Sequence, residues 1–258
     1  MIGIFDSGVG GLSVFREIKK ILPEEDYIYY SDNANCPYGG KPQEFIIERA
    51  KAITEQLLSE GAEIIVVACN TATAIAVKTL RESYPHIRFI GMEPAIKPAA
   101  QLTRSGVIGV LATAGTLSSE KYLKHKEKYA SDIRIAEHVG EGFVELVERG
   151  LTSGELAEET VLKSLQPLLD AGADTIVLGC THYPFLSDTI RKVADCVAPG
   201  QVKGIIDPAP AIARHLKEVM EEEGLLNAPH NSAGQTILHS SGNHAILEGF
   251  FKSEQVQA

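Results

Sequence analysis

Several features that mark whole classes of protein are missing from this sequence. No apolar run approaches the roughly 20 residues that a helix needs to cross a bilayer, and the opening MIGIFDSG has no basic segment followed by an apolar one. We therefore expect neither a membrane partner nor a signal peptide. The basic residues are scattered apart from a short cluster at Lys121–Lys128, and the formal charge is −10. An acidic chain without a basic stripe argues against nucleic acid as its main partner.

Cysteine is also scarce. The four cysteines are Cys36, Cys69, Cys180 and Cys196, and none forms a CxxC pair. This spacing suggests neither a disulfide scaffold nor a familiar zinc site, even if Cys69 and Cys180 are combined with His182 and a water. We therefore predict no metal site and a reducing, cytoplasmic location.

What the sequence does contain is a regular alternation of short β-branched runs and longer amphipathic stretches, with 44% hydrophobic residues overall. The expected strands are Ile2–Phe5, Tyr27–Ser31, Ile64–Ala68, Arg88–Met92, Gly106–Ala112, Ile133–His138, Thr175–Gly179, Gly204–Ile206 and Gln235–His239. The expected helices are Gly11–Ile21, Pro42–Glu60, Ala72–Glu82, Pro94–Leu102, Ser118–Tyr129, Gly142–Arg149, Gly154–Ala171, Leu186–Ala194, Ala209–Glu223 and Asn243–Phe250. This order predicts an α/β protein with mostly parallel sheets covered by helices.

One pattern occurs twice. The segment GAEIIVVAC, ending at Cys69, returns 111 residues later as GADTIVLGC, ending at Cys180. A weaker echo, 106 residues apart, relates Ile2–Ser7 to Ile108–Thr113. The two similar offsets predict two similar three-layer α/β halves, related by a pseudo-two-fold axis and presenting one cysteine each to a shared cleft.

Two motifs near the start of the chain are rich in glycine. In FDSGVGGLS the dinucleotide fingerprint GxGxxG fails, because its last position is Ser13. Asp6 or Ser7 could cap the following helix, or Asp6 could offer a carboxylate at the sheet edge beside amides that bind an anion. In CPYGG, Tyr38 is either a packed ring or a ring and hydroxyl for a binding site, and Cys36 is expected to be structural.

Cys69 and Cys180 each follow a buried strand and precede small polar residues. Buried core is the ordinary environment of one such cysteine, but two at matching strand ends favour chemistry. A helix amino terminus favours the thiolate form. Acyl transfer needs only one activated thiol, and a thiol–disulfide role needs both sulfurs at bonding distance. Inversion of a carbon needs two groups, one removing a proton and one returning it, which a thiolate–thiol pair supplies symmetrically.

Five segments in order, FDSGVGGLSV, CPYG, VVACNTAT, MEPAIKPA and VLGCTHYPFL, together resemble glutamate racemases of the aspartate/glutamate racemase superfamily. The resemblance runs from Gly3 to about Phe250, and GCTHYP resembles the glutamate rather than the aspartate enzymes. It implies a cofactor-independent enzyme of two α/β domains, at 1–93 plus 207–258 and at 94–206. It further implies a homodimer that interconverts L- and D-glutamate and so supplies D-glutamate for peptidoglycan.

The resemblance also implies roles for individual residues. Cys180 takes the proton from L-glutamate and Cys69 from D-glutamate, with Asp6 and His182 assisting the proton transfers. The residues implied to hold the charged groups of the substrate are Asp6, Ser7, Tyr38, Gly39, Asn70, Thr71, Thr181 and His182. Where many relatives carry a Cys-Pro-Leu-type segment, this chain has Val139–Phe143, although Glu148 matches the acidic position that follows.

The four motifs FDSGVGGLS, CPYGG, CNTAT and CTHYP contain no Arg or Lys. We therefore expect neutral side chains, backbone amides and helix ends to hold the carboxylates of the substrate. Three alternatives stay open on the sequence: a racemase of another amino acid or of hydantoins, a thiol hydrolase or amidase, and a pure binding protein.

Overall fold

The computed structural model describes residues 1–93, 95–129, 132–227 and 232–256. The chain forms two compact units, Met1–Met92 with Ala209–Ala258 (unit 1) and Glu93–Pro208 (unit 2). Each unit is described by itself below. Compactness does not test independent folding, so the division into domains at 1–93 plus 207–258 and 94–206 stays a prediction.

Unit 1 is built on a five-stranded sheet in the order β4-β3-β1-β2-β9, and all of its strand pairs are parallel. The strands are β1 (Ile2–Asp6), β2 (Tyr27–Ser31), β3 (Ile64–Val67), β4 (Arg88–Gly91) and β9 (Thr236–Ser240). The helices are α1 (Leu12–Ile21), α2 (Gln43–Ser59), α3 (Asn70–Ser83), α10 (Ala209–Glu223) and α11 (His244–Val256), with short 3₁₀ turns η1 (Asn33–Asn35) and η2 (Tyr38–Gly40).

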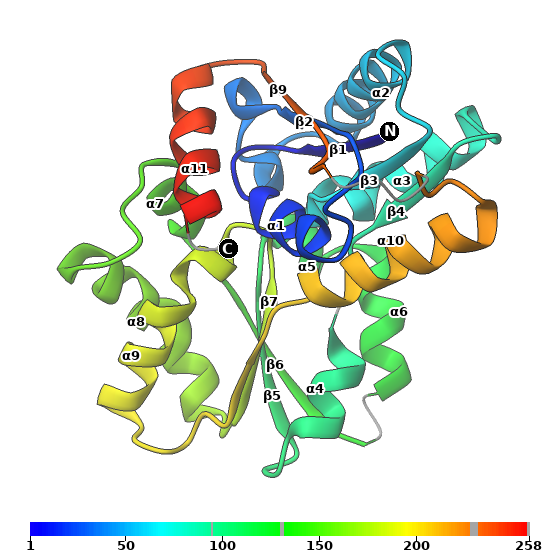
Figure 1. Cartoon of the computed structure of the whole chain (residues 1–258). Coiled ribbons are helices and arrows are strands. Elements are labelled where there is room, and N and C mark those ends of the chain that lie inside the picture. The colour runs from blue at the N-terminus through cyan, green and yellow to red at the C-terminus, as the bar shows by residue number, and fades with distance from the viewer. Residues whose placement is uncertain (94, 130–131, 228–231, 257–258) are drawn as a thin grey trace. The chain divides into compact units, whose positions relative to one another are not determined.

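The sheet of unit 1 is covered on both faces because alternate side chains of its strands point in opposite directions. Phe5 and Ile65 belong to a buried cluster formed with α2 and α3. On α1, Phe15 instead packs edge-on against the rings of Tyr27 and Tyr29, and α1 in turn packs on α10 and α11. Unit 1 is therefore a three-layer α/β structure (Figure 1).

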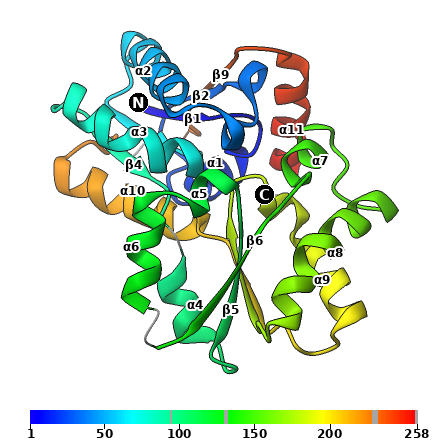
Figure 2. The ribbon, with the colours of Figure 1, turned by 180° about the vertical axis from the view of Figure 1, so that it is seen from behind.

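Unit 2 contains a four-stranded sheet in the order β6-β5-β7-β8, again with parallel pairs. Its strands are β5 (Val107–Ala112), β6 (Arg134–Val139), β7 (Thr175–Gly179) and β8 (Gly204–Ile206). Its helices are α4 (Ile96–Leu102), α5 (Ala114–Leu117), α6 (Glu120–Tyr129), α7 (Phe143–Glu148), α8 (Glu155–Asp170) and α9 (Ser187–Val197), with a 3₁₀ turn η3 (Tyr183–Leu186). Helices α4 and α6 lie on one side of this sheet and α8 and α9 on the other (Figure 2).

The two sheets repeat one topology. In unit 1 the order β4-β3-β1-β2 matches β8-β7-β5-β6 in unit 2 when each strand number is raised by four, and β9 is an addition at the edge of the first sheet. The prediction of two similar α/β halves with parallel sheets is therefore confirmed. In unit 1, β2 and β3 lie on opposite sides of β1, and in unit 2, β6 and β7 lie on opposite sides of β5. Sheets of this kind bind ligands where the strand order reverses, at the carboxyl ends of the strands. These positions are the carboxyl ends of β1 and β3 in one sheet and of β5 and β7 in the other.

Four helices differ most from the sequence prediction. Helix α9 ends at Val197 rather than at Ala194, and α11 ends at Val256 rather than at Phe250. Helix α3 begins at Asn70 rather than at Ala72, and the short helix α5 was not expected. The expected helix start at Pro94 lies outside the described residues, and the described part of that helix begins at Ile96. No helix among the described residues is both long enough and apolar enough to span a membrane.

Gly11, just before α1, has no room for a side chain. A Cβ atom there would lie 2.6 Å from the Cβ of Asp6, 2.7 Å from the hydroxyl of Tyr29 and 3.2 Å from the Cβ of Ala68. We expect Gly11→Ala to lower the free energy of unfolding by about 1–3 kcal/mol, since crowding of this kind forces neighbouring groups to shift. Chemical denaturation measures the change.

The matched control for this substitution is Gly249→Ala on α11. A Cβ atom at Gly249 would meet nothing within 4 Å. Alanine there is expected to raise the free energy of unfolding by about 0.5–1 kcal/mol, because glycine is the weaker helix former. Equal losses of stability in the two variants would contradict the assignment of close packing to Gly11.

Candidate active site

Cys69 lies where β3 ends and α3 begins. It is the N-cap residue of α3, and its sulfur accepts a hydrogen bond from the backbone N–H of Ala72 at 3.4 Å. The thiol also lies 3.7 Å from the hydroxyl oxygen of Ser7, at the end of the neighbouring strand. A backbone donor and a helix amino terminus both favour negative charge at this sulfur.

Asp6 is the last residue of β1 and Ser7 follows it; β1 lies beside β3 in the sheet. Asp6 is fully buried, and its Oδ2 accepts a hydrogen bond from the N–H of Gly8 at 2.9 Å. The N-cap residue of α1 is Gly11, and no side chain caps that helix. The interpretation of Asp6 or Ser7 as a helix cap is therefore wrong, because the glycine-rich turn separates both residues from the helix.

Asn70 and Thr71 form the first turn of α3 and are both buried. The Oδ1 atom of Asn70 is buried and has no hydrogen-bond partner among the described residues. A buried acceptor without a partner is unfavourable. This oxygen, next to Cys69, is therefore a candidate acceptor for a donor group of a bound molecule.

Tyr38 lies in η2 and is 1% exposed, with its hydroxyl donating to Oδ2 of Asp32 at 2.5 Å. Burial, and then the charge and hydrogen bond of Asp32, raise the pKa of Tyr38 well above its ordinary value, and the charge of Cys69 acts in the same direction. Tyr38 and Cys69 belong to one buried cluster, and η2 contacts α3. Gly39, which follows Tyr38, is half-buried. We call Asp6, Ser7, Tyr38, Cys69, Asn70 and Thr71 the Cys69 cluster.

Cys180 stands in the corresponding position after β7, but its surroundings differ. It is followed by η3 rather than by an α-helix, so its sulfur is not an N-cap. The Sγ atom instead lies 3.8 Å from Nδ1 of His182, and the hydroxyl of Thr181 lies 3.5 Å from the same nitrogen. The repeat in sequence therefore gives two thiols with different partners, a helix terminus for Cys69 and an imidazole for Cys180.

His182 is almost fully buried and is held by Glu148 on α7, with 2.7 Å between Nε2 and Oε1. A carboxylate only accepts hydrogen bonds, so Nε2 carries the proton. In the neutral ring Nδ1 is then an acceptor, and it is the nitrogen that faces Cys180. The arrangement Cys180–His182–Glu148 therefore provides an oriented base beside the thiol.

The structure adds two residues that the sequence did not single out. Tyr183 is fully buried, and its pKa is raised by burial first and by the charge of Cys180 second. Thr113 follows β5, whose last residue Ala112 pairs with Gly179, so it lies at the same sheet edge as Cys180. The signal for Tyr183 was present, since it belongs to CTHYP as Tyr38 belongs to CPYGG. We call Thr113, Glu148, Cys180, Thr181, His182 and Tyr183 the Cys180 cluster.

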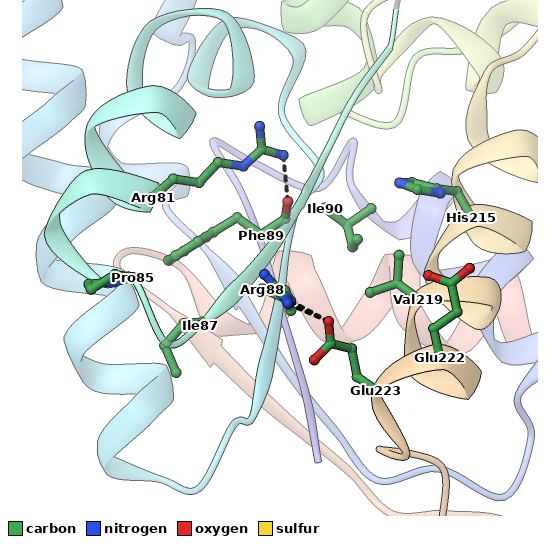
Figure 3. Close-up of a pocket in the computed structure, with 10 residues that line it drawn as sticks. All are labelled: Arg81, Pro85, Ile87, Arg88, Phe89, Ile90, His215, Val219, Glu222 and Glu223. Atoms are coloured by element: carbon green, nitrogen blue, oxygen red, sulfur yellow. Dashed lines mark hydrogen bonds and ion pairs between the residues drawn. The ribbon is translucent and has the colours of Figure 1, made fainter.

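A cavity of about 420 Å³ lies elsewhere in unit 1, between β4, the end of α3 and α10 (Figure 3). Arg81 donates to the carbonyl of Phe89 at 2.8 Å on one side of it, and Arg88 pairs with Glu223 on the other. Arg88 is the first residue of β4, so the cavity opens near the amino end of that strand. The residues that line it do not include any member of the Cys69 cluster.

Over the described residues of each unit, no three His, Cys, Asp or Glu side chains form a group able to hold a metal ion. All four cysteines lie in the described part of the chain and are recorded as thiols.

Comparison with known proteins assigns the chain to a family. The family model of the Asp/Glu/hydantoin racemases matches residues 2–216. The chain belongs to the Asp/Glu/hydantoin racemase family. It is 48% identical to the glutamate racemase of Ectopseudomonas mendocina over 225 residues, which cover 87% of this chain and 84% of that protein. Membership of this family confirms the expectation of an amino-acid racemase.

Solved structures of Asp/Glu/hydantoin racemases give the same result for the fold. The glutamate racemase isoform RacE1 of Bacillus anthracis matches with a TM-score of 0.86 and 32% identity, over 100% of this chain and 94% of that one. The glutamate racemase of Francisella tularensis, solved in complex with D-glutamate, matches with a TM-score of 0.82 and 30% identity, over 97% and 93%. The resemblance to glutamate racemases seen in the sequence is confirmed.

Proposed function

We propose that this chain is a glutamate racemase that interconverts L- and D-glutamate with Cys69 and Cys180 as its two acid/base groups. The observation that carries the proposal is the equivalence of β3 and β7: each is followed within two residues by a cysteine, at the carboxyl edge of a sheet of the same strand order. Racemisation requires one acid/base group on each face of the α-carbon, and a two-fold repeated half-site supplies one thiol for each face.

The proton transfers follow from the partners of each thiol. With L-glutamate, the Cys180 thiolate removes the α-proton, and the Cys69 thiol donates its proton to the opposite face. With D-glutamate the roles reverse. Asp6 assists transfer at Cys69, while His182 exchanges a proton with Cys180 through Nδ1 and Glu148 holds the ring.

The α-carbon of an amino acid is a weak acid, so the site must stabilise a carbanion-like state with donors that are already in place. The N–H groups at the start of α3 suit a carboxylate, and Oδ1 of Asn70 suits the ammonium group because it is buried without a partner. Ser7, Tyr38, Gly39, Thr71 and Thr181 supply neutral polar groups around them. Arg49 comes near the Cys69 cluster, but both of its described hydrogen bonds go to Asp32.

We further propose, on the family resemblance, that the enzyme needs no cofactor, works as a cytoplasmic homodimer, and supplies D-glutamate for peptidoglycan. The acidic chain and its thiols suit a cytoplasmic enzyme. None of these proposals is required for the reaction itself, which needs only glutamate and the two thiols.

The function is tested by incubating the purified chain with L-glutamate in deuterium oxide. We expect D-glutamate to form and deuterium to enter the α-position, because the thiols exchange their protons with solvent. Chiral chromatography and mass spectrometry measure both. Since enantiomers have equal free energies in water, kcat/KM must also be equal in the two directions.

The same assay with L-aspartate, other L-amino acids and a hydantoin decides between racemases of this family. A preference for any of these over glutamate would overturn the substrate assignment. Release of a new product without label at the α-position would instead indicate a thiol hydrolase. Unchanged glutamate would overturn the proposed reaction.

A further inference from the structure

We propose that Arg49 is a positioning residue for Cys69: its guanidinium neutralises Asp32, and Asp32 fixes the hydroxyl of Tyr38, which packs in the same buried cluster as Cys69. The three residues come from α2, the end of β2 and η2. The proposal rests on the proposed function, in which Cys69 must be able to exist as a thiolate.

Asp32 is a fully buried carboxylate whose hydrogen bonds come from four side chains. Arg49 donates from Nε to Oδ2 at 3.0 Å and from Nη2 to Oδ1 at 2.7 Å, which is the two-pronged geometry of a strong ion pair. Tyr38, the amide of Asn35 and Ser241 supply the others. Burial by itself raises the pKa of Asp32, but these hydrogen bonds outweigh it and the pKa is lowered. Asp32 is therefore ionised at neutral pH, and the guanidinium of Arg49 balances its charge.

Tyr38 transmits this arrangement to Cys69. Its single proton is donated to Asp32, so its orientation is fixed and the hydroxyl stays neutral. Tyr38 packs in the same buried cluster as Cys69, and η2 contacts α3, the helix that Cys69 caps. The charge of Cys69 accordingly acts to raise the pKa of Tyr38. Electrostatic interaction acts in both directions, so charge located behind Tyr38 also acts on the thiolate.

Removing the charge of Arg49 therefore leaves a buried carboxylate without its cation, a short way behind Tyr38. Like charges disfavour each other's ionised forms, so the Cys69 thiolate becomes less favourable. Removing the charge of Asp32 instead should affect the Cys69 thiolate less. The side chain of Arg49 is 28% exposed, so water can solvate it when Asp32 is replaced. Asp6, the other buried carboxylate at this sheet edge, is unaltered in each variant.

The test measures alkylation of Cys69 by iodoacetamide over a pH series, followed by mass spectrometry of the peptide that contains Cys69. At neutral pH we expect Arg49→Gln to slow this alkylation by about tenfold or more, equivalent to about one pKa unit. Asp32→Asn should change the alkylation rate by less than about threefold. Arg49→Gln combined with Asp32→Asn should also stay within about threefold of the unaltered chain, because this double variant has no unpaired buried charge. Arg81→Gln, which removes another arginine of unit 1 that donates to a protein oxygen, is the control.

A purely structural role for Arg49 gives a different pattern. Loosened packing around η2 would expose Cys69 and speed its alkylation in Arg49→Gln, and Asp32→Asn would not reverse the effect. Either that pattern or an unchanged rate overturns the proposal. If Arg49→Gln does not fold, Arg49→Lys keeps the charge without the two-pronged geometry, and its alkylation rate should stay within about threefold of the unaltered chain.

Alkylation does not depend on turnover, which separates this proposal from the function it rests on. A chain that fails to racemise glutamate but shows the pattern of slowing and recovery would overturn the function alone. A chain that racemises glutamate but shows no slowing in Arg49→Gln would overturn the role of Arg49 alone.

Discussion

Replacing either Cys69 or Cys180 with alanine is expected to lower racemisation of glutamate by at least about 10²- to 10⁴-fold, the usual contribution of a positioned acid/base group. Each thiol serves one face of the α-carbon, and a methyl group can neither remove nor return a proton. The loss should appear in kcat/KM equally for both directions, because the equilibrium between enantiomers is unchanged. Chiral chromatography of each reaction measures it.

The variants should also reveal which enantiomer each thiol serves. Cys69→Ala keeps Cys180, so in deuterium oxide it should label L-glutamate at the α-position without inverting it, and Cys180→Ala should do the same for D-glutamate. Cys196→Ala is the control, since Cys196 is exposed on α9 and should leave both activities intact. Substantial racemisation by either single-thiol variant would rule out the two-thiol mechanism.

Glu148→Gln is expected to lower kcat by about 10²-fold or more with a smaller change in KM. Glu148 accepts from Nε2 of His182 and so leaves Nδ1 as the acceptor that faces Cys180. A glutamine can donate to Nε2, which would move the ring proton to Nδ1 and remove that acceptor. Steady-state kinetics in both directions measure the effect.

Glu141→Gln is the matched control for this substitution. Glu141 lies in the Val139–Phe143 segment that leads into α7, and its side chain is exposed to solvent. Its replacement should leave kcat and KM within about twofold, because exposed charges are screened by water and salt. Equal losses in the two variants would indicate a general effect of negative charge near α7 rather than an oriented imidazole.

Much of the fold was predictable because each strand and helix carries its own periodic signal. Strands Tyr27–Ser31, Thr175–Gly179 and Gly204–Ile206 have the predicted bounds. The early start of α3 could not be predicted, because it depends on the Cys69 sulfur taking the place of an oxygen cap. The four residues of α5 are too few, and include a glycine, to produce a helical pattern.

The motifs located the two clusters, but the contacts inside them join distant segments. Glu148 precedes His182 by 34 positions, and no local pattern marks the two as partners. Arg49 lies among other charged residues on α2 and looks like an ordinary solvent-facing side chain until the fold brings Asp32 to it. The sequence therefore indicated which residue types carry the chemistry, while the residues that orient them required the structure.

The strand β9 has a consequence for how the protein is made. It pairs Tyr27 with Thr236 at the edge of the first sheet, so unit 1 is interrupted by the continuous segment that forms unit 2. A ribosome delivers the chain from its amino terminus, and domains tend to fold as they emerge. Unit 2 is thus complete in the nascent chain while β2 is still an open edge strand, which is the kind of surface that pairs with other chains. The order of synthesis leaves the first half of the protein to be finished last, and β2 is the segment that a chaperone or a neighbouring nascent chain would meet.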